Sequence, residues 1–122
     1  MYKLEELEVW KKARKFRISI SEMTKNFPKD EQFRLKDQMT RSARSIAANI
    51  AEGFGRFHFQ ENIQFCRIAR GSLFETKEHV FCALDENLIS EPEFDDFTKN
   101  FDDLLKMLNG YISYLKKAKQ GD

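Results

Sequence analysis

The sequence predicts an all-α fold, an antiparallel up-down-up-down four-helix bundle, formed by a single domain over residues 1–122. Four segments carry apolar residues at steps of three and four, which is the period of an amphipathic helix. No segment shows strand-like alternation of useful length. The 122 residues include five Gly and two Pro, too few for the many turns of a sandwich or barrel. Four long helices joined by short links favour a bundle.

The first expected helix covers residues 7–26, and the second covers residues 31–53. Phe27-Pro28 should end the first, because the residue before a proline avoids helical angles. Asp30 is the candidate cap of the second, which should end at the Gly53-Phe54-Gly55 break. The apolar face of the first consists of Val9, Ala13, Phe16, Ile20 and Met23. That of the second consists of Leu35, Met39, Ala43, Ile46 and Ile50.

The third expected helix covers residues 59–87, and the fourth covers residues 92–118. Ser90 is a suitable cap for the fourth, since Pro92 and two glutamates follow it at the positive end of the helix dipole. The core face of the third consists of Phe59, Cys66, Ala69, Leu73, Val80 and Leu84. That of the fourth consists of Phe94, Phe97, Phe101, Leu104, Leu108, Tyr111 and Leu115.

No residue pattern indicates catalysis, a metal site or a cofactor. His58 and His79 have no Cys or His at the following third or fourth position, so zinc spacing is absent. Gly53-Phe54-Gly55 lacks the Lys-Ser/Thr pair of a phosphate-binding loop. Glu52, Glu75 and Glu78 are read as ion-pair partners rather than catalytic acids. The sequence therefore predicts a protein that is not an enzyme.

The cysteine and hydropathy patterns favour a cytoplasmic protein that does not enter a membrane. Cys66 and Cys82 lie on one expected helix, about 24 Å apart at the rise of an α-helix, so they cannot form a disulfide with each other. Free thiols favour a reducing compartment. No apolar stretch approaches the roughly 20 residues that a membrane span needs.

The charged residues are distributed unevenly along a chain whose net charge is +1. Residues 1–57 hold 13 Lys and Arg against 8 Asp and Glu, whereas residues 58–122 hold 8 against 12. The basic half makes a nucleic-acid interface plausible, because arginine suits phosphate oxygens and stacks on bases. The expected nucleic-acid-binding residues, from the second and third helices and the turn between them, are Arg34, Arg41, Arg44, Arg56, Arg67 and Arg70. The basic residues of the first helix, including Arg14 and Arg17, are read as a solvated face.

The second helix is apolar on two sides after Arg44. Such a helix needs a second packing partner, and a small bundle buries one stripe per helix, so a homo-oligomer is expected. Tight packing within one chain is the alternative. Antiparallel pairing should also bring Gly71-Ser72 close to Arg41 and Ser42. The expected interface residues are Ala47, Ala48 and Ala51.

Asn49 and Glu52 interrupt the most apolar stretch of the chain. Buried polar groups must be satisfied, so one interpretation pairs them with Arg56, Arg70 or backbone atoms and assigns them a structural role. The other interpretation is a polar site at that end of the bundle. The sequence favours the first.

Residues 38–56, from Gln38 to Arg56, closely resemble the signature of bacterial four-helix-bundle proteins encoded in intervening sequences of 23S ribosomal RNA. Four further segments agree, and the resemblance covers about residues 4–90. They are Leu7–Ala13, Thr24–Pro28, Glu31–Leu35 and Ile68–Glu75. The motif positions that the resemblance marks as structural are Asn49, Glu52, Gly53, Gly55, Gly71, Ser72 and Glu75, with Arg56 in the same string.

This family is similar to accessory proteins of diversity-generating retroelements. That similarity implies a pentameric ring with a basic surface, acting on RNA or DNA without sequence preference, with a reverse transcriptase as an implied partner. The expected function is thus a ring-forming nucleic-acid-binding scaffold or accessory protein. A protein-protein interaction scaffold with no nucleic-acid role is the alternative.

Overall fold

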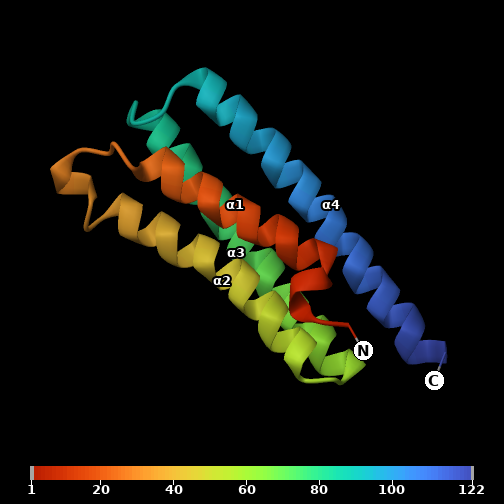
Figure 1. The fold of residues 1–122 in the computed structure, drawn as a ribbon. Helices are drawn as coiled ribbons and strands as arrows, with labels where there is room; N and C mark the ends of the chain where they lie inside the picture. Colours follow the sequence, from red (N-terminus) through yellow and green to blue (C-terminus); the bar gives the residue numbers. More distant parts are fainter. Residues whose placement is uncertain (1, 122) are drawn as a thin grey trace.

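The computed structural model describes residues 2–121, which form four α-helices and two short 3-10 helices (Figure 1). The α-helices are α1 (Glu8–Thr24), α2 (Leu35–Gly55), α3 (Phe59–Asp85) and α4 (Glu91–Gly121). The 3-10 helices are η1 (Leu4–Glu6) and η2 (Lys29–Glu31). No strand occurs among the described residues. The prediction of an all-α four-helix bundle is confirmed.

Each helix runs antiparallel to the one before it, and the α2–α3 turn lies at the same end of the bundle as both termini (Figure 1). α2 packs most extensively against α3, and α1 contacts both α2 and α4. The four helices therefore form a closed square in the order α1, α2, α3, α4. In this arrangement the α1–α2 side faces away from the α3–α4 side.

The core is built from the apolar faces that the sequence predicts. The rings of Phe16 and Phe97 lie 5.7 Å apart, and those of Phe97 and Phe101 lie 6.0 Å apart. Burying an aliphatic or aromatic side chain of this size stabilises the fold by about 1.5–3 kcal/mol. Side chains that are fully shielded from solvent include Ala13, Met39, Ile46, Ile50, Cys66, Leu73, Val80, Leu104 and Leu108.

The link between α1 and α2 differs from its prediction, because α2 begins at Leu35 and not at residue 31. Arg34 has φ −118° and ψ −99°, which breaks the helical path. Before it, Glu31 N donates to Pro28 O in the 3-10 helix η2, and the Gln32 amide donates to Phe27 O over 2.7 Å. These hydrogen bonds satisfy backbone groups of the link within the link itself. The acidic residues Asp30 and Glu31 therefore lie in η2, a separate turn, and not in the first turn of α2.

The predicted break at Gly53-Phe54-Gly55 is wrong, since both glycines lie inside α2. The turn falls at residues 56–58, where Phe57 adopts a left-handed conformation with φ 54°. Gly53 serves a different purpose. A Cβ there would lie 2.7 Å from Asn62 Oδ1 and 2.9 Å from Phe65 Cβ, so the missing side chain lets α3 approach α2 closely.

The link between α3 and α4 is held by standard capping. α3 ends at Asp85, two residues before its predicted end, because Asn87 turns the chain at φ 59° while Leu88 N donates to Ala83 O. Ser90 caps α4 as predicted. Its hydroxyl accepts from Glu93 N over 3.2 Å, and the Glu93 carboxylate accepts from Ser90 N over 2.9 Å.

Candidate nucleic-acid interface

The seam between α2 and α3 contains a line of short polar side chains. The Ser45 and Ser72 hydroxyls lie 2.8 Å apart, and the Thr76 hydroxyl donates to Ser42 Oγ over 2.8 Å. Asn49 donates to the Ser45 carbonyl over 2.8 Å, so it is satisfied inside its own helix. Ser72 therefore lies opposite Ser45, and Thr76 links it to Ser42, the neighbour that the sequence predicts.

Small residues and satisfied hydrogen bonds give this seam a structural role. The Glu52 carboxylate lies 3.2 Å from Arg56 Nε. Its side chain is exposed, so Glu52 is not one of the buried polar groups that the sequence predicts. Glu75 lies 3.3 Å from His79 Nε2. Gly55 and Gly71 have open space where a Cβ would stand, so packing does not require glycine at either position.

Carboxylates accompany three of the six arginines in the predicted nucleic-acid-binding set. Arg34 lies 3.9 Å from Glu31, Arg41 lies 3.5 Å from Asp37, and Arg56 also lies 4.0 Å from Glu61. The Arg41 and Arg56 pairs are exposed and contribute little to stability, whereas Glu31 is buried beside an exposed Arg34. These pairs do, however, place a negative charge beside each guanidinium.

The other three predicted arginines lie on two different sides of the bundle. Arg44 lines a hollow between α1 and α2, together with Arg17. Arg70 donates to Asn109 Oδ1 on α4 over 2.8 Å. Arg67 lines a hollow of about 210 Å³ on the α3–α4 side with Lys116 and Lys119. The structure therefore does not bring the six arginines together.

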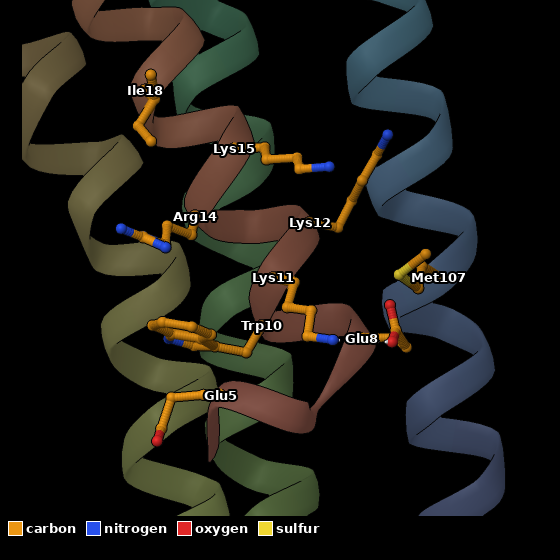
Figure 2. A pocket seen from close by; sticks show the side chains of 9 residues that line it. All are labelled: Glu5, Glu8, Trp10, Lys11, Lys12, Arg14, Lys15, Ile18 and Met107. Carbon is orange, nitrogen blue, oxygen red and sulfur yellow. Dashed lines mark hydrogen bonds and ion pairs between the residues drawn. The ribbon is translucent and has the colours of Figure 1, made fainter. Parts of the chain in front are cut away.

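A basic surface does form where α1 meets α2. Figure 2 shows Trp10 and Arg14 reaching from α1 toward α2, while Lys12 and Lys15 point toward α4. The Arg14 guanidinium lies 6.0 Å from the centre of the Trp10 ring. We call Trp10, Arg14, Arg17 and Arg44 the α1–α2 basic face. Within residues 2–121, no carboxylate lies within ion-pair distance of its three arginines.

The outer side of α1 is also hollowed. A groove of about 530 Å³ runs past Trp10, Arg14, Lys15 and Ile18 to Met107 of α4 (Figure 2). From the sequence alone, the basic residues of this helix are predicted to form a solvated face. The spacing of Trp10, Arg14 and Arg17 at steps of four and three is the signal that places them on one side of the helix.

The three alanines of the predicted oligomer interface have different exposures. Ala47 is 1% exposed and is buried within the protomer, whereas Ala48 is exposed and Ala51 is partly exposed. They line a shallow hollow of about 440 Å³ with Leu4 and Trp10. On the other side of the bundle, α3 exposes Ile68 by 51% and Phe74 by 50%.

The titratable groups do not point to a reaction. Burial raises the pKa of the Cys66 thiol to about 12, which keeps it protonated and unreactive. Burial, followed by the nearby Glu78 carboxylate, raises the pKa of Cys82. Burial also raises the pKa of Tyr111. Across residues 2–121 no group of three or more His, Cys, Asp or Glu side chains is arranged to hold a metal ion.

None of the helices in the described part of the chain is both long enough and apolar enough to cross a membrane.

Comparison with known proteins places the chain in a family. The family model described as 23S rRNA-intervening sequence protein matches residues 5–110, which extends the motif resemblance into α4. A solved structure of a protein of unknown function from the S23 ribosomal protein family of Bacteroides thetaiotaomicron has a TM-score of 0.79. At 23% identity, covering 86% of this chain and 95% of that chain, it shows a shared fold. Neither description names an enzymatic activity. No curated protein matches the chain.

Proposed function

The chain belongs to the 23S rRNA-intervening sequence protein family, and we propose that it is a non-enzymatic, ring-forming protein that binds RNA or DNA without sequence preference. The α1–α2 basic face carries the proposal. Arg14, Arg17 and Arg44 come from two helices to one surface, and no described carboxylate neutralises them. Arginines of this kind bind phosphate oxygens irrespective of base sequence.

The oligomer is proposed from two surfaces that lie on different sides of the protomer. The alanine hollow lies between α1 and α2, and the exposed Ile68 and Phe74 side chains lie on α3. If one copy inserts α3 side chains into the hollow of the next, the contact is head-to-tail, and such a contact forms a ring when the rotation between copies closes. A pentamer is the expected ring. Because Arg17 and Arg44 border the hollow, nucleic-acid binding and assembly are expected to influence each other.

The binding test compares two triple variants that remove the same charge. Arg14→Gln, Arg17→Gln and Arg44→Gln alter the α1–α2 basic face, whereas Arg34→Gln, Arg41→Gln and Arg56→Gln alter arginines already paired with carboxylates. Fluorescence anisotropy with labelled duplex should show that the first set weakens binding strongly and makes the salt dependence shallower by up to about three units of log–log slope. The second set should change both much less.

Three outcomes would contradict the proposal or redirect it. An absence of binding even at low salt overturns nucleic-acid binding. If the Arg34, Arg41 and Arg56 variant loses more affinity than the other variant, the interface lies on the outer edge of α2. Light scattering that finds a monomer at micromolar concentration removes the ring.

A protein-protein scaffold is the second candidate, favoured by the exposed apolar side chains of α3. In that case charge reversal at Arg41 and Arg44 leaves function intact, whereas Ile68→Glu abolishes it. A reverse transcriptase remains a proposed partner, which co-purification with such an enzyme would test.

A further inference from the structure

The α2–α3 turn and both termini lie at the same end of the bundle (Figure 1). Aromatic side chains from these segments gather there. They surround an open hollow of about 290 Å³, which we call the aromatic hollow. Its rings come from the N-terminal segment, the α2–α3 turn and the last turns of α4, so only the folded chain assembles them. The aromatic residues are Tyr2, Phe54, Phe57, Phe59, Tyr111 and Tyr114.

Three of these rings are largely exposed to solvent. Tyr2 is 51% exposed, Tyr114 is 62% exposed and Phe57 is 76% exposed. Tyr114 stacks on Tyr111 with ring centres 6.3 Å apart and planes 15° apart, and the Tyr2 ring meets Phe54 edge to face at 5.9 Å. In each pair a partly buried ring, Tyr111 or Phe54, packs against the exposed ring of Tyr114 or Tyr2. The exposed rings are therefore held in place by packing while they face solvent.

Polar atoms lie between the rings. The Asn62 amide donates to the Tyr111 hydroxyl over 3.1 Å, and the exposed His58 ring lines the same hollow. A planar ligand stacked here would find hydrogen-bonding groups at its edge. This combination of apolar faces with a few polar groups is typical of sites that bind small planar groups.

A second, positively charged hollow lies between the N-terminal part of α3 and the C-terminal part of α4, the same two segments that contribute to the aromatic hollow. It is lined by Arg67, Lys116 and Lys119, together with Gln60 and Ile63. In the described part of the chain the three basic side chains have no carboxylate within ion-pair distance. Glu61 of α3 and Glu52 of α2 pair with Arg56.

The backbone of the turn gives an independent reason to regard Phe57 as functional. At φ 54° an aromatic residue is strained, and Gly or Asn would occupy this position at lower cost. Phe57 recovers little of that cost by burial, because it is 76% exposed. Strained residues that stay exposed are concentrated at functional sites.

We propose that the aromatic hollow holds an unpaired base of a single-stranded RNA or DNA, stacked on Tyr114 and Phe57, while Arg67, Lys116 and Lys119 contact the adjoining phosphates. Single strands are bound through stacking on aromatic rings combined with a positive track for the backbone. A duplex does not fit this site, since its bases are already stacked on one another. The inference rests on the proposed function and adds to it a preference for single strands.

The test uses short single-stranded RNA and DNA oligonucleotides that contain 2-aminopurine, whose fluorescence falls when the base stacks. The wild-type protein should quench it and should bind single strands more tightly than the duplex of the same sequence. Tyr114→Ala and Phe57→Asn should each remove most of the quenching and weaken single-strand binding about fivefold or more. Phe33→Ala is the matched control. Phe33 is 89% exposed in the link between α1 and α2, and this link lies at the opposite end of the bundle (Figure 1).

A second readout separates this inference from the proposed function. The chain has one tryptophan, Trp10, which lies on the α1–α2 basic face, so its emission reports binding there. If the duplex perturbs Trp10 but 2-aminopurine is unchanged, the basic face stands and the aromatic hollow is overturned. If duplex binding survives neutralisation of Arg14, Arg17 and Arg44, while Tyr114→Ala removes the quenching, the hollow stands and the basic face fails.

Two further results would overturn the inference. Equal affinity of the wild type and Tyr114→Ala for single strands shows that the rings do not bind bases. Self-association that Phe57→Asn abolishes, without any change in 2-aminopurine, shows that the hollow is instead covered by a second copy of the chain. RNA and DNA probes compared side by side show which backbone the site prefers.

Discussion

The two ends of α3 meet the same structural requirements with different residues. At its C-terminal end, Asn87 takes the left-handed position and Ser90 and Glu93 form a capping box for α4. At its N-terminal end, Phe57 takes the left-handed position and His58 caps the helix through a 3.4 Å contact from Glu61 N. Asn and Ser are favoured by backbone chemistry alone, whereas Phe and His are not.

This difference indicates where selection acts on something other than folding. The C-terminal end of α3 uses residues that stabilise the turn at least cost. The N-terminal end exposes an aromatic ring and an imidazole, and both line the aromatic hollow. Functional sites are typical places for local rules to fail, which agrees with the site that we propose at the N-terminal end of α3.

The largest expected effect is the loss of stability at alkaline pH, to which the two cysteines of α3 should contribute differently. The folded pKa of Cys66 is about 12, raised from 9.0 by burial, so the protonated thiol stabilises the fold fully below pH 9. As pH rises from 9 toward 12, the unfolded chain loses this proton first, and stability should fall by about 1.4 kcal/mol per pH unit. Urea unfolding at pH 8 and at pH 10.5 measures the loss.

Cys66→Ala should flatten this alkaline decline. Cys82→Ala should flatten it less, because Cys82 is partly exposed, although its pKa is raised as well. An equally steep decline in the Cys66→Ala protein would show that another group, such as Tyr111, dominates at high pH.

The next effect compares two glycines near the N-terminal end of α3. Gly53→Ala should destabilise the fold by about 1–2 kcal/mol, since its Cβ would overlap Asn62 and Phe65. Gly55→Ala should stabilise it by about 0.5–1 kcal/mol, because the space there is open and alanine favours the helix. Thermal unfolding measures both changes in stability. If the two substitutions change stability in the same direction, the close approach of α2 and α3 at Gly53 is refuted.

A reciprocal exchange at the two left-handed positions should have an effect of about 1 kcal/mol in opposite directions. Phe57→Asn is expected to raise the free energy of unfolding, and Asn87→Phe to lower it. Chemical denaturation of the two variants checks the signs. A Phe57→Asn protein that is less stable than the wild type would mean that Phe57 contributes through packing, and the functional interpretation of its strain would lose its basis.

The smallest expected effect concerns the two caps. Ser90→Ala should cost about 1 kcal/mol because it removes one half of a capping box, and His58→Ala should cost less than half of that because its contact is long. Differential scanning calorimetry can rank the two. If His58→Ala were the costlier change, the histidine would be a structural cap and not a residue available to a ligand.

Much of the fold was predictable because helical periodicity is a local property. The apolar faces of all four helices, the Ser90 cap and the end of α1 near Phe27-Pro28 follow from residues within a few positions of one another. Helix boundaries near Gly53 and residue 31 were not predictable. Gly53 lies within α2 because α3 packs against it, and that contact joins segments that a local pattern cannot relate.

The candidate site was only partly predictable. The sequence predicts Arg44 as a binding residue, but it predicts only a solvated face for Arg14 and Arg17. It also groups Arg67 and Arg70 with Arg44, although they lie on the α3–α4 side of the bundle. The aromatic hollow gave no local signal, since Tyr2, Phe57 and Tyr114 are far apart in the chain.

By itself the sequence determined the helical class, the composition of the core faces and the family motif, because each depends on the order of residues along a short stretch. Tertiary structure decided which charges lie together, which arginines are neutralised, and which aromatic rings remain exposed. These are properties of surfaces, and a surface is assembled from helices whose relative register is fixed by long-range packing. In this protein that packing brings arginines of α1 and α2 to one face and rings from three segments to one end.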